Sequence, residues 1–89
     1  MFFVTTIRML GEVEYDCRCI GYYETWKEAQ AVVKKHAECL YEAGHYQYVV
    51  IEEFSSGWYP VATIEEWFKF SEDGKSVSNI VKPDIFQNF

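Results

Sequence analysis

Residues 18–33, RCIGYYETWKEAQAVV, join a strand-like aromatic run to a helical pattern without a linker. Thr25 and Glu28 have the T-x-x-E spacing of a capping box, in which the threonine hydroxyl accepts from an orphan helix N–H. An apolar stripe follows at helical spacing, and Gly44 stands where a helix C-terminus favours glycine. The stripe consists of Trp26, Ala29, Val33, Ala37 and Leu40. The junction therefore predicts a strand that turns into one capped helix.

The remaining segments predict strands, because they are rich in β-branched and aromatic residues. Residues 9–16 are expected to form a loop, and Asp73-Gly74 is a hairpin turn signal. Pro60 confines its segment to an edge or a loop, since it has no amide donor. The predicted strands are 1–8 (MFFVTTIR), 17–23 (CRCIGYY), 46–54 (YQYVVIEEF), 65–70 (EEWFKF) and 76–83 (SVSNIVKP), with a short continuation at 58–62 (WYPVA).

Strands joined by turns too short for a crossover must pair antiparallel. The order strand-strand-helix-strand-strand-strand therefore predicts an α+β fold: a single twisted antiparallel sheet of about five strands with one helix packed on one face. Residues 1–89 are expected to form one domain.

The aromatic content bears on the sheet face that the helix leaves open. The chain has seven Phe, seven Tyr and three Trp, or 19% aromatic residues, which exceeds what so small a core can bury. Alternation along the strands puts about half of them on the open face, where we expect water, a ligand or a second subunit. The C-terminal DIFQNF is expected to pack against the domain through its phenylalanines.

The net charge of −6 argues against binding to a nucleic-acid backbone or to an anionic membrane, since both require a surplus of Lys and Arg. The apolar runs are too short to span a bilayer, and the first ten residues lack the features of a secretory signal. The sequence therefore predicts a soluble cytoplasmic protein.

The potential metal ligands and nucleophiles are Cys17, Cys19, His36, Cys39 and His45. Their spacings are not those of structural zinc sites, so we expect no metal site and no cofactor. Cys17 and Cys19 should face one side of a strand, from which either could meet Cys39, but the expectation is free cysteines in the core. Cys39 and His36 are the one local nucleophile–base pair, and the neighbouring glutamates oppose thiolate formation. We therefore predict no catalytic residue and no enzyme.

Paired carboxylates occur at Glu52-Glu53 and Glu65-Glu66. Consecutive strand residues point to opposite faces, so neither pair forms a dyad by itself. One member of each pair could converge across neighbouring strands, but such charges are more often solvated edge residues.

Arginine and aromatic side chains make up the candidate binding surface, because guanidinium groups pair with phosphate while rings stack on a base. The same combination is typical of protein interfaces. Alternation would place Arg18 beside Tyr22, so we expect Arg18 to contribute to binding if that side of the sheet is open. The candidate residues are Arg8, Arg18, Tyr22, Tyr46, Tyr48, Trp58 and Tyr59.

The phrases VTTIR, RCIGYYETWKEAQAVV, YQYVVIEEFSSGWYP and EEWFKF, with the final NF, resemble a family of small acidic proteins from Firmicutes and their bacteriophages. The family has no established activity, so the resemblance assigns no site residue. It implies a phage or mobile-element product that acts by occupying a host protein or a nucleotide signal of bacterial defence.

Two hypotheses follow. The first is a non-enzymatic, phage-encoded binding protein that sequesters a nucleotide-like molecule or blocks a host protein. The second is a homo-oligomeric structural or housekeeping module without a small-molecule ligand.

Overall fold

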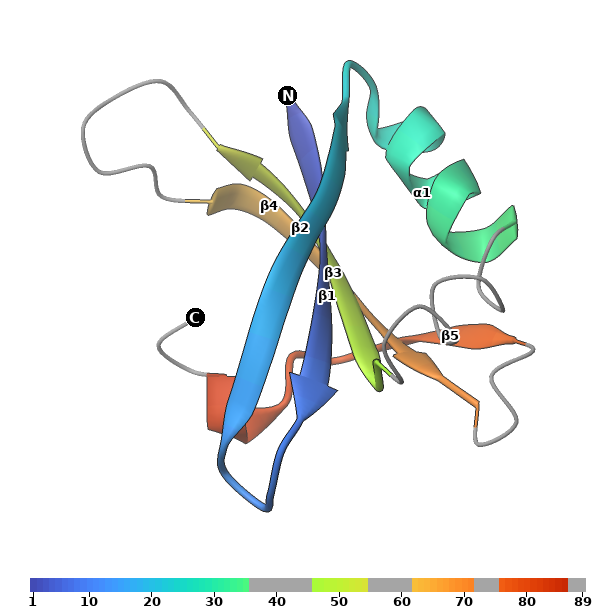
Figure 1. Ribbon diagram of the computed structural model, residues 1–89. Helices are drawn as coiled ribbons and strands as arrows, with labels where there is room; N and C mark the ends of the chain where they lie inside the picture. Colours follow the sequence, from blue (N-terminus) through green and yellow to red (C-terminus); the bar gives the residue numbers. More distant parts are fainter. Residues whose placement is uncertain (36–45, 55–61, 72–75, 87–89) are drawn as a thin grey trace.

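The computed structural model describes residues 1–35, 46–54, 62–71 and 76–86. It shows one five-stranded antiparallel sheet with the strand order β2-β1-β3-β4-β5 and a single helix, α1, packed on it (Figure 1). The predicted fold class is thereby confirmed. The elements are β1 (Phe2–Met9), β2 (Tyr15–Tyr23), α1 (Trp26–Lys35), β3 (Tyr48–Phe54), β4 (Ala62–Phe70), β5 (Val77–Ile80) and the short 3-10 helix η1 (Asp84–Phe86).

The first hairpin is longer than the sequence predicts. β1 and β2 pair as far as Met9 and Tyr15, and a turn closes the hairpin through the Leu10 N–H, which donates to the Glu14 carbonyl at 2.8 Å. Asp16, predicted to lie in the loop, instead accepts from Arg8 across the ladder at 2.7 Å. Opposite charges on paired strands are compatible with a ladder, so β2 begins at Tyr15 and not at Cys17 as predicted.

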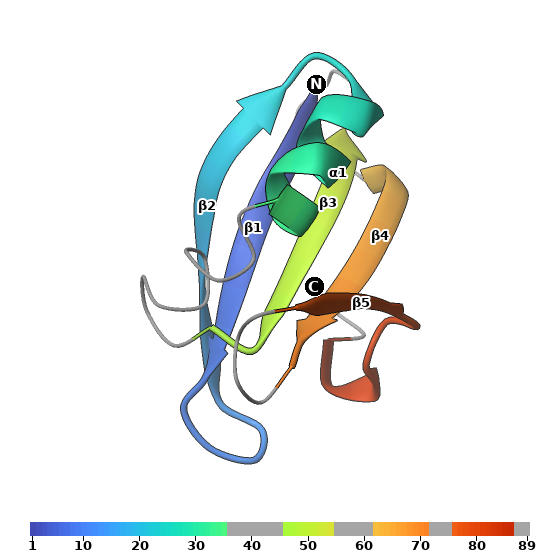
Figure 2. The ribbon, with the colours of Figure 1, turned by 90° about the vertical axis from the view of Figure 1, so that its right-hand side faces the viewer.

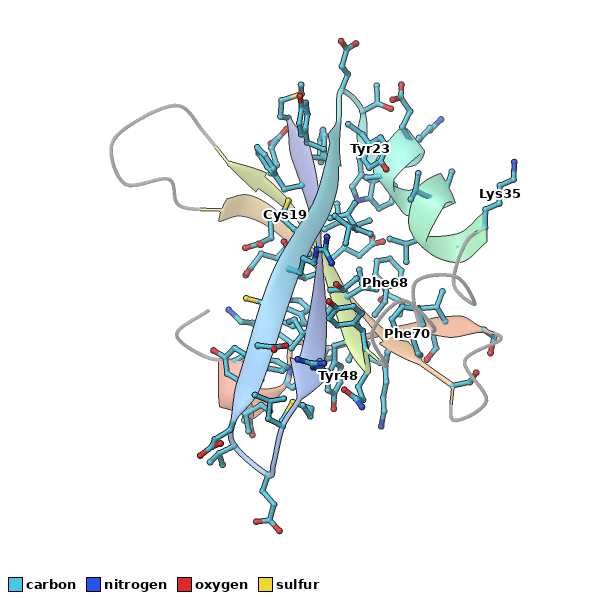
Figure 3. The ribbon with its side chains drawn as sticks, viewed as in Figure 1. Cys19, Tyr23, Lys35, Tyr48, Phe68 and Phe70 are labelled. Atoms are coloured by element: carbon cyan, nitrogen blue, oxygen red, sulfur yellow. The ribbon has the colours of Figure 1, made fainter. Side chains whose placement is uncertain are left out.

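The helix begins with the threonine half of the predicted capping box. The Glu28 N–H donates to the Thr25 hydroxyl at 3.2 Å, and α1 starts at Trp26. Ala29 and Val33 are fully buried, and they pack with Val4, Val49 and other side chains in the core between helix and sheet. Figure 2 shows α1 in front of the sheet, and Figure 3 shows Tyr23, Phe68 and Phe70 on the same side.

A second core lies on the sheet face away from α1. Phe86 of η1 is fully buried there and packs with Ile7, Val50 and Trp67. η1 and α1 thus lie on opposite sides of the sheet (Figure 1). The expectation that this whole face awaits water, ligand or another subunit is therefore wrong for this part of it. The reason is the apolar C-terminal segment, which covers the face from within the chain, as the phenylalanines of DIFQNF predict.

A β-bulge in β2 changes which side chains share a face. Val4 pairs with Gly21 and Thr5 with Cys19, so Ile20 is an extra residue in β2. Such an insertion interrupts the simple alternation of a strand. Tyr15 and Tyr23 therefore pack into opposite cores, although they are an even number of residues apart.

Several predictions fall outside the described residues. These are the end of the helix at Gly44, the segment around Pro60, the Asp73-Gly74 turn, and the side chains of His36, Cys39 and His45. Among the helices that the structure describes, none is long and apolar enough to cross a membrane.

Candidate functional site

Two aromatic rings and two carboxylates line up across four strands on the face away from α1. Tyr22 pairs with Phe3, Phe3 with Glu52, and Glu52 with Glu65. Directly paired residues of an antiparallel sheet project on the same side with Cβ atoms about 5 Å apart. We call Tyr22, Phe3, Glu52 and Glu65 the transverse row.

Glu52 is the unusual member of the transverse row. Only 6% of the residue is exposed, and no described residue forms a hydrogen bond or an ion pair with its carboxylate. Burial raises the pKa of Glu52 to about 7, the neighbouring charge of Glu65 adds to the rise, and Lys82 opposes it. A charged carboxylate without a hydrogen-bond partner in an apolar setting is costly. The protonated form of Glu52 is therefore favoured up to near neutral pH.

Lys82, which follows β5, lies next to Glu65 at the end of the transverse row. Its Nζ lies 3.5 Å from a carboxylate oxygen of Glu65, and the two side chains are 25% and 28% exposed. The same Nζ lies 5.8 Å from the centroid of the Trp67 ring, within the range of a cation–π contact. Lys82 thus satisfies Glu65 and leaves the Glu52 carboxylate without an ion-pair partner.

An open depression of about 370 Å³ adjoins this ion pair. Its lining includes Glu65, Trp67, Ile80 and Lys82. Trp67 is held firmly, because its ring stacks on Phe86 with a centroid distance of 5.0 Å and an interplanar angle of 13°. Of the two carboxylates, Glu65 is therefore the one that solvent reaches through this depression, while Glu52 lies buried beside it.

The other members of the two carboxylate pairs lie on the opposite face. Glu66 accepts a hydrogen bond from the Gln30 side chain of α1 at 3.1 Å, so it ties the helix to β4. The convergence of Glu52 with Glu65 across neighbouring strands is thus confirmed, whereas the interpretation of Glu52 as a solvated edge residue is wrong. β3 lies inside the sheet, where neighbouring strands on both sides shield its side chains.

The predicted arginine and aromatic surface does not come together. Arg8 is held by Asp16, whose hydrogen bond and charge raise the Arg8 pKa. Arg18 pairs with Thr6 and is exposed, whereas Tyr22 pairs with Phe3 on the other face. The prediction that Arg18 and Tyr22 lie side by side is therefore wrong, because the bulge at Ile20 separates them.

The remaining candidate rings are also dispersed. Tyr46 is 9% exposed and belongs to the helix-side core. Tyr48 lies on the opposite face and meets Phe86 edge-on at 5.4 Å. Tyr22 is 63% exposed and lies 6.0 Å from Phe3. Trp58 and Tyr59 lie outside the described residues.

Cys17 and Cys19 share one face, as predicted, but both are exposed and not in the core. Their partners in the ladder are Ile7 and Thr5, which places the thiols on the side away from α1, as Figure 3 shows for Cys19. Burial and the charges of Asp16 and Glu52 raise the pKa of Cys17, which disfavours its thiolate. Within the part of the chain that the structure describes, no three His, Cys, Asp or Glu side chains gather as metal ligands.

The role of Lys82 was missed, since one lysine after a short strand carries no distinguishing pattern. The detectable signal lay in the acidic pairs of β3 and β4 and the lysine after β5, which only the strand register turns into a cluster. Comparison with protein-family models, curated proteins and solved structures found no match to this chain.

Proposed function

We propose that this protein is a non-enzymatic binding protein that acts by occupying a basic surface of a partner protein. The observation that carries the proposal is the pair Glu52 and Glu65, two adjacent carboxylates on one sheet face with Glu52 almost fully buried. A sheet of this size gains no stability from such a pair. Buried charge without a hydrogen-bond partner is more readily explained by binding, since a cationic partner would supply the missing donors.

The surroundings of the carboxylates suit a protein partner. Tyr22 is largely exposed beside Phe3, so the transverse row combines an accessible aromatic end with an acidic end. Aromatic anchors next to charged groups are typical of interface hot spots. The net charge of −6 would steer a basic partner toward the protein and raise the association rate.

A nucleotide-type ligand has less support. Its phosphate would require a free guanidinium beside a ring, yet Arg8 is paired with Asp16, and Arg18 lies on the opposite face from Tyr22. The rings of the transverse row share it with Glu52 and Glu65, whose negative charge repels phosphate.

The resemblance to small phage proteins suggests the biological setting. In that setting the chain would be phage-encoded and would work in the host cytoplasm. The partner would be a host protein, and blocking it would counteract bacterial defence. This part of the proposal rests on the resemblance alone.

Chemical-shift mapping with ¹⁵N-labelled protein tests the proposed function. We expect a lysine- and arginine-rich peptide to shift amides of β1, β3 and β4 around the transverse row, and a panel of mono-, di- and cyclic nucleotides to leave them unshifted. Glu65→Gln should weaken peptide binding at least about threefold, because it removes one of the two converging carboxylates.

Glu12→Gln is the matched control, since it changes the net charge equally on an exposed residue of the β1–β2 turn. Equal weakening by both variants would show unspecific charge attraction and contradict the proposal. Shifts caused by nucleotides around Arg8 or Arg18 would contradict it as well.

A homo-oligomeric module remains the second candidate function. It is favoured by β2, a nine-residue strand at the edge of the sheet with exposed side chains on both faces. Edge strands pair readily with a second chain. Light scattering at micromolar concentration tests this candidate, and a monomer would exclude it.

A further inference from the structure

Lys82 shows which chemical group the acidic end of the transverse row accepts. Its ammonium lies beside Glu65 and near the Trp67 ring, on a chain segment that follows β5. The contact is partly exposed and long for an ion pair, so it contributes little to stability. It is an internal example of an ammonium group at this site.

The charges at the site are not balanced. Two carboxylates, Glu52 and Glu65, face one ammonium, and β1 contributes the uncharged Phe3 and Thr5 to this face. The raised pKa of Cys17 on β2 disfavours its thiolate, so this side chain does not change the charge balance. One further monovalent cation would neutralise the site, and a proton on Glu52 is the alternative.

We propose that Glu52 and Glu65 form a binding site for the ammonium group of a lysine on the partner protein. The inference rests on the proposed function and names the group that is recognised. An ammonium has three N–H donors, so it can bridge both carboxylates and supply Glu52 with the hydrogen bond it lacks within the described residues.

Binding replaces the proton on Glu52 by the ammonium group of lysine. In the free protein the Glu52 carboxyl is partly protonated at neutral pH, since its pKa is about 7. The incoming ammonium pairs with the carboxylate, and the proton leaves to solvent. Affinity for lysine therefore rises as the pH increases through 7, and Glu52 titrates at lower pH in the complex.

The test uses a capped Gly-Lys-Gly peptide and an uncharged control in which norleucine, a lysine side chain without its ammonium group, replaces lysine. The carboxyl ¹³C shift of Glu52, followed across pH, reports the protonation of this residue directly. We expect the lysine peptide to lower the apparent pKa of Glu52 and the norleucine peptide to leave it unchanged.

Two variants separate a built site from general charge attraction. Lys82→Met should raise the affinity for the lysine peptide about threefold or more, because it removes the competing ammonium. Glu52→Gln should lower the affinity by a similar factor and abolish its dependence on pH. The controls are Lys27→Met and Glu12→Gln, which change the same charges at exposed positions away from the row.

An unchanged Glu52 titration with the lysine peptide overturns the inference, as does an equal effect of Lys82→Met and Lys27→Met. A pKa of Glu52 that responds to Ca²⁺ or to butylamine but not to the peptide overturns it too. If basic peptides still map to the transverse row in these cases, the proposed function stands without the lysine site. If no basic peptide binds, the proposed function itself fails.

Discussion

Glu52 couples the stability of the fold to pH. Its pKa is about 7 in the folded protein, against an ordinary value of 4.5 for a solvated glutamate, so the folded state holds the proton more tightly. Below both pKa values the carboxyl is protonated in the folded and the unfolded state, so the free energy of unfolding does not change with pH through this group. As the pH rises from about 4.5 to 7, the unfolded chain releases the proton first, and the free energy of unfolding falls.

Glu52→Gln should remove this dependence. One pKa unit corresponds to about 1.4 kcal/mol, so the wild-type protein should lose up to about 3 kcal/mol between pH 4.5 and pH 8 that the variant retains. Urea unfolding of both proteins at pH 5 and pH 8 measures the difference, with Glu12→Gln as the control. Parallel pH profiles of wild type and Glu52→Gln would show that Glu52 is solvated in the folded state.

At the scale of elements, the helix start could be predicted and the strand faces could not. The T-x-x-E pattern is local, and the Thr25 hydroxyl caps α1 as the pattern requires. The bulge at Ile20 depends on pairing with β1, which no property of β2 alone reveals. One extra residue was enough to separate Arg18 from Tyr22. The cluster of Glu52 with Glu65 has the same origin, since it arises from the register between β3 and β4.

Removal of the cap should destabilise the domain measurably. Thr25→Ala loses the hydroxyl that accepts from the Glu28 N–H, and the expected cost is about 1 kcal/mol of unfolding free energy. Thr25→Ser retains an acceptor and should cost much less. Chemical denaturation of the three proteins measures the effect. A serine variant as unstable as the alanine variant would indicate that packing of the threonine methyl, and not the cap, is responsible.

At the scale of the whole molecule, the sheet is covered on both faces, on the second only in part. α1 covers one face, and the η1 segment covers part of the other with a single ring, Phe86. That ring meets Tyr15 edge-on at 4.8 Å and stacks on Trp67, so it joins the first hairpin to the last strands.

Phe86→Ala should cost about 3–5 kcal/mol, the range for truncation of a buried phenylalanine. The total free energy of unfolding of such domains is roughly 5–15 kcal/mol, so a large drop in melting temperature is expected. The neighbouring Ile85 is exposed, and Ile85→Ala should leave the melting temperature nearly unchanged. Similar melting curves for Phe86→Ala and wild type would show that the second core does not contribute to stability.

The place of β1 between β2 and β3 in the sheet sets the order in which the chain can assemble. β1 pairs with β2 through a short turn, but its other edge pairs with β3, which follows the helix in the sequence. During synthesis the first hairpin and helix therefore leave the ribosome before the strand that completes the inner ladder. Until β3 arrives, a row of amide and carbonyl groups on β1 stays open to neighbouring chains, and such edges are where nascent proteins aggregate. We therefore expect the pairing of these distant segments to be slower than the closure of the hairpin.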